Sequence, residues 1–175
     1  MSGAIFFDRD NTLIVDKGYT WKISDFAFLS DSAEALALLH IHQIPVFIVT
    51  NQSGIARGYY SETDMLKFNQ HLQEEVTKKG GRITDIAYCP HHPDYPETKE
   101  NSNWCTCRKP APGMLIALSQ KWKIDLSQSF MIGDQDSDLQ AGSAAGCQQS
   151  YLLHADQSRV TLCEKILTNF FKGKK

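Results

Sequence analysis

The sequence lacks an apolar run of the roughly 20 residues that a membrane-spanning helix needs, which argues against a membrane protein. Its N-terminus lacks a basic segment, a long apolar stretch and a cleavage site, so no signal peptide is predicted. The formal net charge is only -2, which gives no strong electrostatic attraction to nucleic acid or to an acidic membrane. We therefore expect a cytoplasmic protein that binds neither.

Cysteines are few and odd in number, five in 175 residues. Three of them, Cys89, Cys105 and Cys107, fall in one stretch without a periodic pattern. In a chain expected to stay in a reducing compartment, such bunching favours a metal site over disulfides. Repeats, low-complexity tracts and long linkers are also absent. We expect a single domain over residues 1–175, with a metal-binding loop over residues 89–107.

What the sequence does contain is an alternation of short apolar runs and helical patterns. Continuous apolar runs are typical of buried parallel strands, and apolar residues at helical spacing indicate covering helices. Strands are predicted at 4–8, 45–50, 83–88, 129–132 and 150–153, and helices at 32–42, from 61 to the glycines at 80 and 81, 112–122, 136–145 and 156–171. This order predicts an α/β fold, a Rossmann-like three-layer sandwich with a central parallel sheet.

Three of the predicted strands end on residues suited to phosphate chemistry. The first leads into Asp8 and Asp10, the second ends at Thr50, and the fourth leads to Asp134. Open α/β sheets bind ligands at the carboxyl ends of their strands, so these side chains are expected to meet in one crevice. Two adjacent acids can act as nucleophile and proton donor, and a further carboxylate can hold Mg²⁺. The sequence thus predicts a phosphoryl-transfer site.

Each motif has a plainer interpretation when it stands alone. An Asp-x-Asp pair also occurs in solvated turns and calcium loops, although leucine stands here where a calcium loop needs glycine. The polar stretch after Thr50 could be an ordinary turn, and no Walker sequence occurs. Arg108 and Lys109 could be a surface basic pair. Asp136, and in part Asp138, is explained as a first-turn acid that stabilises a helix.

The cysteine-rich stretch holds two groups of metal ligands, Cys89 with His91 and Cys105 with Cys107. Three thiolates and one imidazole satisfy tetrahedral zinc without an open position, which indicates a structural site. His92 is an alternative fourth ligand. An ordered loop of this length has no core of its own, so a metal staple is expected. The competing interpretation is a set of buried thiols with unrelated neighbours.

Taken together, four motifs resemble those of the haloacid dehalogenase-like (HAD) phosphatases. They are Asp8-Arg9-Asp10-x-Thr12, Thr50-Asn51-Gln52, Arg108-Lys109-Pro110 and Gly133-Asp134. The cysteine and histidine loop narrows the likeness to the histidinol-phosphatase-like branch, and residues 16–19, 49–58 and 89–93 support it. The resemblance runs from residue 5 to about residue 153. It implies a cap-poor HAD fold in which the zinc loop partly takes the place of a lid.

The resemblance also implies a role for each matching residue. Asp8 would be the nucleophile that forms an aspartyl-phosphate, and Asp10 the general acid and base. Thr50 and Lys109 would stabilise the phosphoryl group. Magnesium would be held by Asp8, Asp134 and the backbone carbonyl of Asp10, and zinc by Cys89, His91, Cys105 and Cys107. The substrate site would be formed by Asp16, Lys17, Gly18, Tyr19, Asn51, Gln52, Ser53, Arg57 and Arg108.

The implied activity is removal of the C7 phosphate from a heptose bisphosphate, which supplies heptose for cell-surface glycans. The alternatives are a phosphatase of histidinol phosphate or of another small sugar phosphate and, outside the enzymes, a zinc-stapled binding module. A small sugar bisphosphate is the expected partner, and we expect a monomer.

Two residues depart from the family pattern. Asn11 stands where glycine is usual, and Gln135 stands where a basic residue is usual. Asparagine tolerates left-handed backbone better than most residues, so the turn at Asn11 is expected to persist. The missing positive charge at Gln135 bears on substrate preference rather than on the reaction.

Overall fold

The computed structural model describes residues 2–95 and 105–172. Five parallel strands form one sheet in the order β3-β2-β1-β4-β5. The strands are β1 (Ile5–Phe7), β2 (Val46–Asn51), β3 (Asp85–Cys89), β4 (Phe130–Gly133) and β5 (Gln149–Leu152). The helices are α1 (Ser32–Ile41), α2 (Glu62–Lys78), α3 (Gly113–Trp122), α4 (Asp136–Ala145) and α5 (Arg159–Lys172). Within these ranges no helix is both long and apolar enough to span a bilayer.

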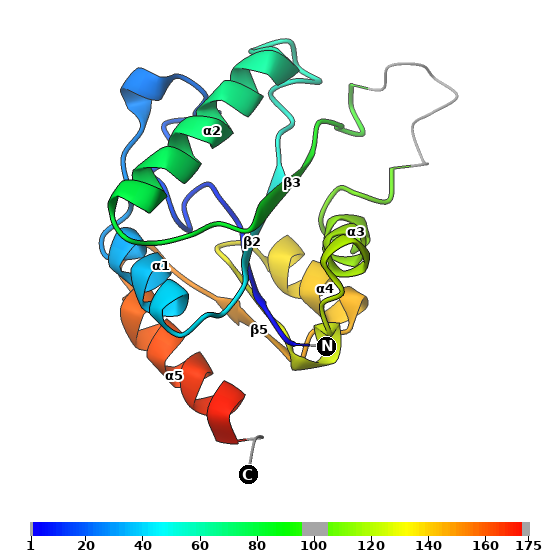
Figure 1. The fold of residues 1–175 in the computed structure, drawn as a ribbon. Helices are drawn as coiled ribbons and strands as arrows, with labels where there is room; N and C mark the ends of the chain where they lie inside the picture. Colours follow the sequence, from blue (N-terminus) through cyan, green and yellow to red (C-terminus); the bar gives the residue numbers. More distant parts are fainter. Residues whose placement is uncertain (1, 96–104, 173–175) are drawn as a thin grey trace.

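The helices cover the two faces of the sheet in separate groups. Helices α1, α2 and α5 lie on one side, and α3 and α4 lie on the other (Figure 1). Successive side chains of a strand point to opposite faces. Ile5 and Phe7 of β1 therefore join the core under the first group of helices, while Phe6 joins the core under the second. The predicted three-layer sandwich with a parallel sheet is confirmed.

Helix α2 begins where its sequence predicts. The Ser61 side chain accepts the N–H of Asp64 at 3.1 Å, and the Asp64 carboxylate accepts the N–H of Ser61 at the same distance. This reciprocal pair is a capping box, which satisfies N–H groups that have no partner inside the helix. The apolar face then follows at helical spacing, with Met65, Phe68, Leu72 and Val76 all buried.

Most elements have limits within one residue of the prediction, but two of them begin two or three residues later than predicted. Strand β3 is Asp85–Cys89 rather than 83–88, and α5 begins at Arg159 rather than at 156. The start of α5 is fixed by the Asp31 carboxylate, which accepts the N–H groups of Arg159 and Val160, each at 3.0 Å. Asp31 lies 128 positions before Arg159, so no local pattern could indicate this cap.

The direction in which successive strands are added to the sheet reverses next to β1, and a crevice is expected at this point. The chain runs from β1 outward through β2 to β3, and then returns to the other side of β1 for β4 and β5. Ligands of open α/β sheets bind at such a switch point, outside the carboxyl ends of the strands. The residues that follow β1 and β4 here are Asp8 and Asp134.

We expect Ser61→Ala to lower the free energy of unfolding by about 1 kcal/mol, because one half of the capping box is lost. Urea denaturation followed by circular dichroism measures this change. Thr63→Ala, at an exposed position in the same helical turn, is the matched control and should have a smaller effect. Equal stability of the two variants would contradict a contribution from the cap.

Candidate active site

Three carboxylates gather at the carboxyl ends of the central strands. Asp8 follows β1, Asp134 follows β4, and Asp138 lies in the first turn of α4. One oxygen of each lies within 4.8 Å of the others. The N–H of Asp8 donates to the carbonyl of Ile132 at 2.8 Å, which continues the pairing of β1 with β4 up to the cluster. The side chains of Asp8 and Asp138 are almost fully buried.

Lys109 provides the positive charge of this cluster. Its Nζ lies 2.5 Å from Asp8 Oδ1 and 2.6 Å from Asp138 Oδ1, and it donates to the carbonyl of Val49 at 2.7 Å. Burial alone would lower the pKa of Lys109, but the two carboxylates outweigh it and the pKa is raised. For Asp8, burial has the opposite effect and raises the pKa to about 7, although the charge of Lys109 opposes the change. The lysine therefore stays charged.

Asn51 binds the backbone of Lys109 through both atoms of its side-chain amide group. Its amide nitrogen donates to the carbonyl of Lys109 at 3.1 Å, and its amide oxygen accepts the N–H of Lys109 at 3.0 Å. Because Asn51 ends β2, this two-point contact ties the lysine to the sheet. Asn51 was expected in the substrate site, and its contacts add a role in positioning Lys109.

Asp138 is the member of the cluster that the predicted magnesium ligands did not include. Its Oδ2 accepts the N–H of Gln135 at 3.0 Å, which is the capping role expected from the sequence. Its Oδ1 faces Lys109. A Cβ atom on Gly133 would lie 2.2 Å from the Asp138 carboxylate, so only glycine allows this approach. The signal for Asp138 was its place one helical turn beyond the strand end.

Asp10 lies at the edge of the crevice, beside Thr50 and Gln52. Its Oδ2 accepts a hydrogen bond from Thr50 Oγ1 at 3.3 Å and from Gln52 Nε2 at 2.9 Å. Arg9 Nη2 lies 2.9 Å from its other oxygen. The Asp10 side chain keeps 21% of its surface exposed. The carboxylate is thus held by protein donors while part of it remains accessible.

The two departures from the family pattern have local explanations. Asn11 has φ of 55°, the left-handed conformation that asparagine was expected to tolerate. Gln135 donates through its amide nitrogen to Asp134 Oδ2 at 2.9 Å. This neutral contact orients the Asp134 carboxylate without adding the positive charge that a basic residue would bring.

In the loop after β1, the side chains of the predicted substrate residues Asp16 and Lys17 make contacts within the same segment of the chain. Asp16 Oδ1 accepts the N–H of Gly18 at 3.1 Å, and the N–H and hydroxyl of Thr20, each at 2.9 Å. Lys17 pairs with Asp25 at 3.2 Å, and both side chains are exposed. Tyr19 keeps 40% of its surface exposed. Tyr19 therefore offers an exposed aromatic ring to a ligand.

Arg57 links the turn after β2 to the segment after β3. Its guanidinium donates to the Tyr95 hydroxyl at 3.1 Å and lies 3.1 Å from His92 Nε2. It also lies over the rings of Tyr95 and Tyr19, at 4.7 and 5.7 Å from their centroids. The carbonyl of Ser53 accepts the N–H of Arg57 at 3.1 Å, which closes the turn. An arginine and aromatic rings thus stand together near the loop after β1.

A second ligand cluster lies where β3 ends. The sulfur atoms of Cys89, Cys105 and Cys107 lie 3.0 to 3.4 Å from one another. Nδ1 of His91 lies 3.3 to 3.6 Å from all three. Of the two candidate histidines, the structure brings His91 to the thiols and His92 to Arg57.

The chemistry of this cluster fits a soft divalent cation. The hydrogen bond between Cys107 and Cys89 is the main factor that lowers the pKa of Cys107 to about 5, and the same contact raises the pKa of Cys89. Three thiolates this close would repel one another without a cation, and thiolates with imidazole are typical zinc ligands. Arg108 lies alongside, with Nη1 donating to the carbonyl of His91 at 3.1 Å.

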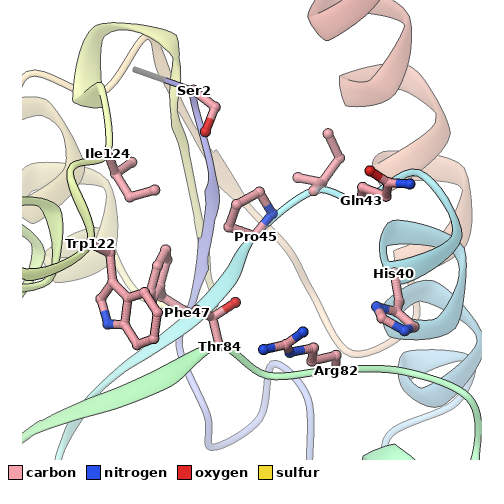
Figure 2. A pocket seen from close by; sticks show the side chains of 10 residues that line it. Ser2, His40, Gln43, Pro45, Phe47, Arg82, Thr84, Trp122 and Ile124 are labelled. Atoms are coloured by element: carbon pink, nitrogen blue, oxygen red, sulfur yellow. The ribbon is translucent and has the colours of Figure 1, made fainter.

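The pocket in Figure 2 lies at the amino ends of the strands, opposite the carboxylate crevice. It has a volume of about 490 Å³, and Ser2, Pro45 and Thr84 line it. These three residues precede β1, β2 and β3, so the pocket opens at the amino ends of the strands. It is therefore separate from the carboxylate crevice.

Comparisons with known proteins agree with this geometry. The HAD-hydrolase-like family model matches residues 106–166. A D-glycero-beta-D-manno-heptose-1,7-bisphosphate 7-phosphatase from Photorhabdus laumondii is 42% identical over 81% of this chain and 75% of its own length. The alpha counterpart from Campylobacter jejuni is 36% identical over 98% of this chain and 96% of its own. A similar crystal structure is that of D,D-heptose 1,7-bisphosphate phosphatase from B. bronchiseptica complexed with magnesium and phosphate. The two structures superpose with a TM-score of 0.79 and 28% sequence identity, over 95% of this chain and 99% of the other chain.

The fold and the carboxylate–lysine site define a HAD-like phosphatase. The chain belongs to the family within that class that contains the D-glycero-D-manno-heptose-1,7-bisphosphate 7-phosphatases. The resemblance drawn from the sequence motifs is confirmed.

We expect Gly133→Ala to lower phosphatase activity by on the order of 100-fold, because the added methyl group must displace the Asp138 carboxylate from Lys109. Phosphate release from 4-nitrophenyl phosphate measures the loss. Gly80→Ala is the control, since it strains a left-handed residue far from the site, in open space. It should lower thermal stability and leave activity in place. Full activity of folded Gly133→Ala would refute the need for this close approach.

Proposed function

We propose that this phosphatase removes the C7 phosphate of D-glycero-D-manno-heptose 1,7-bisphosphate, on the route to activated heptose for lipopolysaccharide. The observation that carries the proposal is the buried contact of Lys109 with Asp8 and Asp138 beside Asp134, at the switch point of the sheet. The names of the two relatives and of the B. bronchiseptica structure support the choice of substrate.

The donor set of the crevice fits magnesium. Carboxylate and carbonyl oxygens are the ligands that Mg²⁺ prefers, and two of the three clustered carboxylates are almost fully buried. We propose that Asp8, Asp134 and the backbone carbonyl of Asp10 hold the ion, with Asp138 in support. When bound, Mg²⁺ offsets the repulsion between these carboxylates and the phosphate. The magnesium and phosphate named for the B. bronchiseptica structure support this choice.

The proposed reaction uses two acids in turn. A carboxylate oxygen of Asp8 attacks phosphorus, the bond from phosphorus to the C7 oxygen breaks, and the leaving alcohol takes a proton from Asp10. Water then attacks the aspartyl-phosphate and gives a proton to Asp10, which releases phosphate and restores Asp8. Lys109 and Thr50 hold the phosphoryl oxygens during both transfers. Lys109 suits this role because its pKa is raised and its charge is kept.

The proposed substrate site lies over the loops that flank the crevice. Arg108 directly precedes Lys109, and Arg57 lies over the ring of Tyr19 in the loop after β1, so each is proposed to contact a phosphate that is not removed. Tyr19 is exposed beside Arg57 and can pack on the sugar. Two arginines around one catalytic centre favour a bisphosphate over a monophosphate such as histidinol phosphate.

A substrate panel tests the proposal. With Mg²⁺, kcat/KM should be highest for a heptose 1,7-bisphosphate anomer, and well below it for histidinol phosphate and fructose 1,6-bisphosphate. Asp8→Asn should reduce phosphate release to background, because a carboxamide is a poor nucleophile. Asp136→Asn, an exposed acid outside the cluster, is the matched control and should stay active.

Each failure has a separate meaning. Faster turnover of histidinol phosphate would replace the proposed substrate. Unchanged activity in Asp8→Asn would overturn the mechanism. A folded wild-type protein that releases phosphate from no substrate would favour the alternative of a zinc-stapled binding module.

We also propose that Cys89, His91, Cys105 and Cys107 bind one structural zinc ion. Elemental analysis should find about one zinc per chain, and a strong chelator should lower the melting temperature. Added zinc should restore the melting temperature, whereas added magnesium should not. Cys105→Ser should lose zinc, and Cys147→Ser, a cysteine outside the cluster, should keep it. A zinc-free protein of full stability would disprove the site.

A further inference from the structure

Arg9 stands between the two catalytic aspartates and is only 1% exposed. Its side chain packs against α2. The guanidinium carbon lies 4.8 Å from the centroid of the Phe68 ring, and Nη1 donates to Asn69 Oδ1 at 2.9 Å. Helix α2 therefore anchors the outer end of this side chain.

The guanidinium then reaches back to Asp10 with a two-point contact. Nη2 donates to Asp10 Oδ1 at 2.9 Å, and Nε donates to Oδ2 at 3.1 Å. Nη2 also donates to the carbonyl of Thr20 at 2.9 Å and to Gln52 Oε1 at 3.1 Å. A planar guanidinium that binds both oxygens of a carboxylate restricts its rotation as well as its position.

Gln52 closes the network from the other side. Its Oε1 accepts hydrogen bonds from Arg9 and from the Tyr60 hydroxyl at 2.6 Å, and its Nε2 donates to Asp10 at 2.9 Å. The opposite amide orientation would turn donors toward Arg9 and Tyr60, so only one orientation satisfies all partners. Gln52 is 2% and Tyr60 7% exposed.

A buried guanidinium loses much of its hydration, and it is stable only when it is paired and hydrogen-bonded. Here the pairing carboxylate belongs to Asp10, the proposed general acid. A general acid has to lie within hydrogen-bond reach of the leaving oxygen, so its orientation matters as much as its charge. The contacts of Arg9 fix that orientation from a buried position that the substrate does not reach.

We propose that Arg9 is a positioning residue for catalysis: braced by α2, it holds the Asp10 carboxylate in the orientation that delivers a proton to the leaving alcohol. This inference rests on the proposed role of Asp10 as general acid, and not on the identity of the sugar.

Dependence on the leaving group tests the inference. The value of kcat/KM covers the steps up to departure of the alcohol, and a poor leaving group needs protonation more than a good one. Arg9→Lys keeps the charge and loses the planar fork. We expect it to lower kcat/KM for phenyl phosphate about tenfold more than for 4-nitrophenyl phosphate.

A double-mutant cycle separates positioning from general destabilisation. In an Asp10→Asn background, Arg9→Lys should cause no further change in the ratio of the two kcat/KM values. Tyr60→Phe should shift the ratio in the same direction by a smaller factor, because it removes one contact from Gln52. Arg159→Lys is the matched control, since Arg159 is also fully buried but bonds to backbone carbonyls, including that of Thr12. It should leave the ratio unchanged.

The outcomes are distinct. An unchanged ratio in folded Arg9→Lys, or an equal shift in the Asp10→Asn background, would overturn the inference. If Arg9→Lys does not fold, as judged by circular dichroism, Tyr60→Phe decides the question by the same two readouts. A wild-type protein that cleaves both aryl phosphates but no heptose bisphosphate would remove the proposed substrate and leave the test of Arg9 intact.

Discussion

The ion pairs of Lys109 with Asp8 and Asp138 are the interaction on which the rest of the site depends. Three acidic side chains within 4.8 Å of one another, two of them buried, repel strongly in a medium of low dielectric constant. The buried ammonium group balances that repulsion, and the carboxylates in turn keep the lysine charged. Each group is stable in the interior only because the other is there.

Hydrogen bonds from the surrounding structure hold the backbone of this lysine in place. Asn51 binds its backbone from the end of β2, and Cys105 accepts the N–H of the preceding residue, Arg108, at 3.4 Å. The sheet thus holds the backbone of Lys109, and the thiol cluster holds the residue before it. A loop that contributes no reacting group therefore helps to set the geometry of the reaction.

Much of the fold could be predicted because its signals are local. Strands buried on both faces read as continuous apolar runs, and the capping box at Ser61 and the left-handed Asn11 follow from the chemistry of single residues. The start of α5 and the role of Arg9 could not be predicted in the same way. They depend on Asp31 and Asn69, which lie 128 and 60 positions from their partners. Only the folded chain shows which distant group satisfies a buried donor.

The central place of β1 also bears on how the chain is made. Ile5 pairs with Val46 on one side and with Phe130 on the other, so one edge of the first strand stays open until β4 has left the ribosome. An open apolar strand edge invites pairing with other chains. Nascent chains that stop before β4 are thus expected to need chaperones, and the enzyme gains its active site only after β4 has been made.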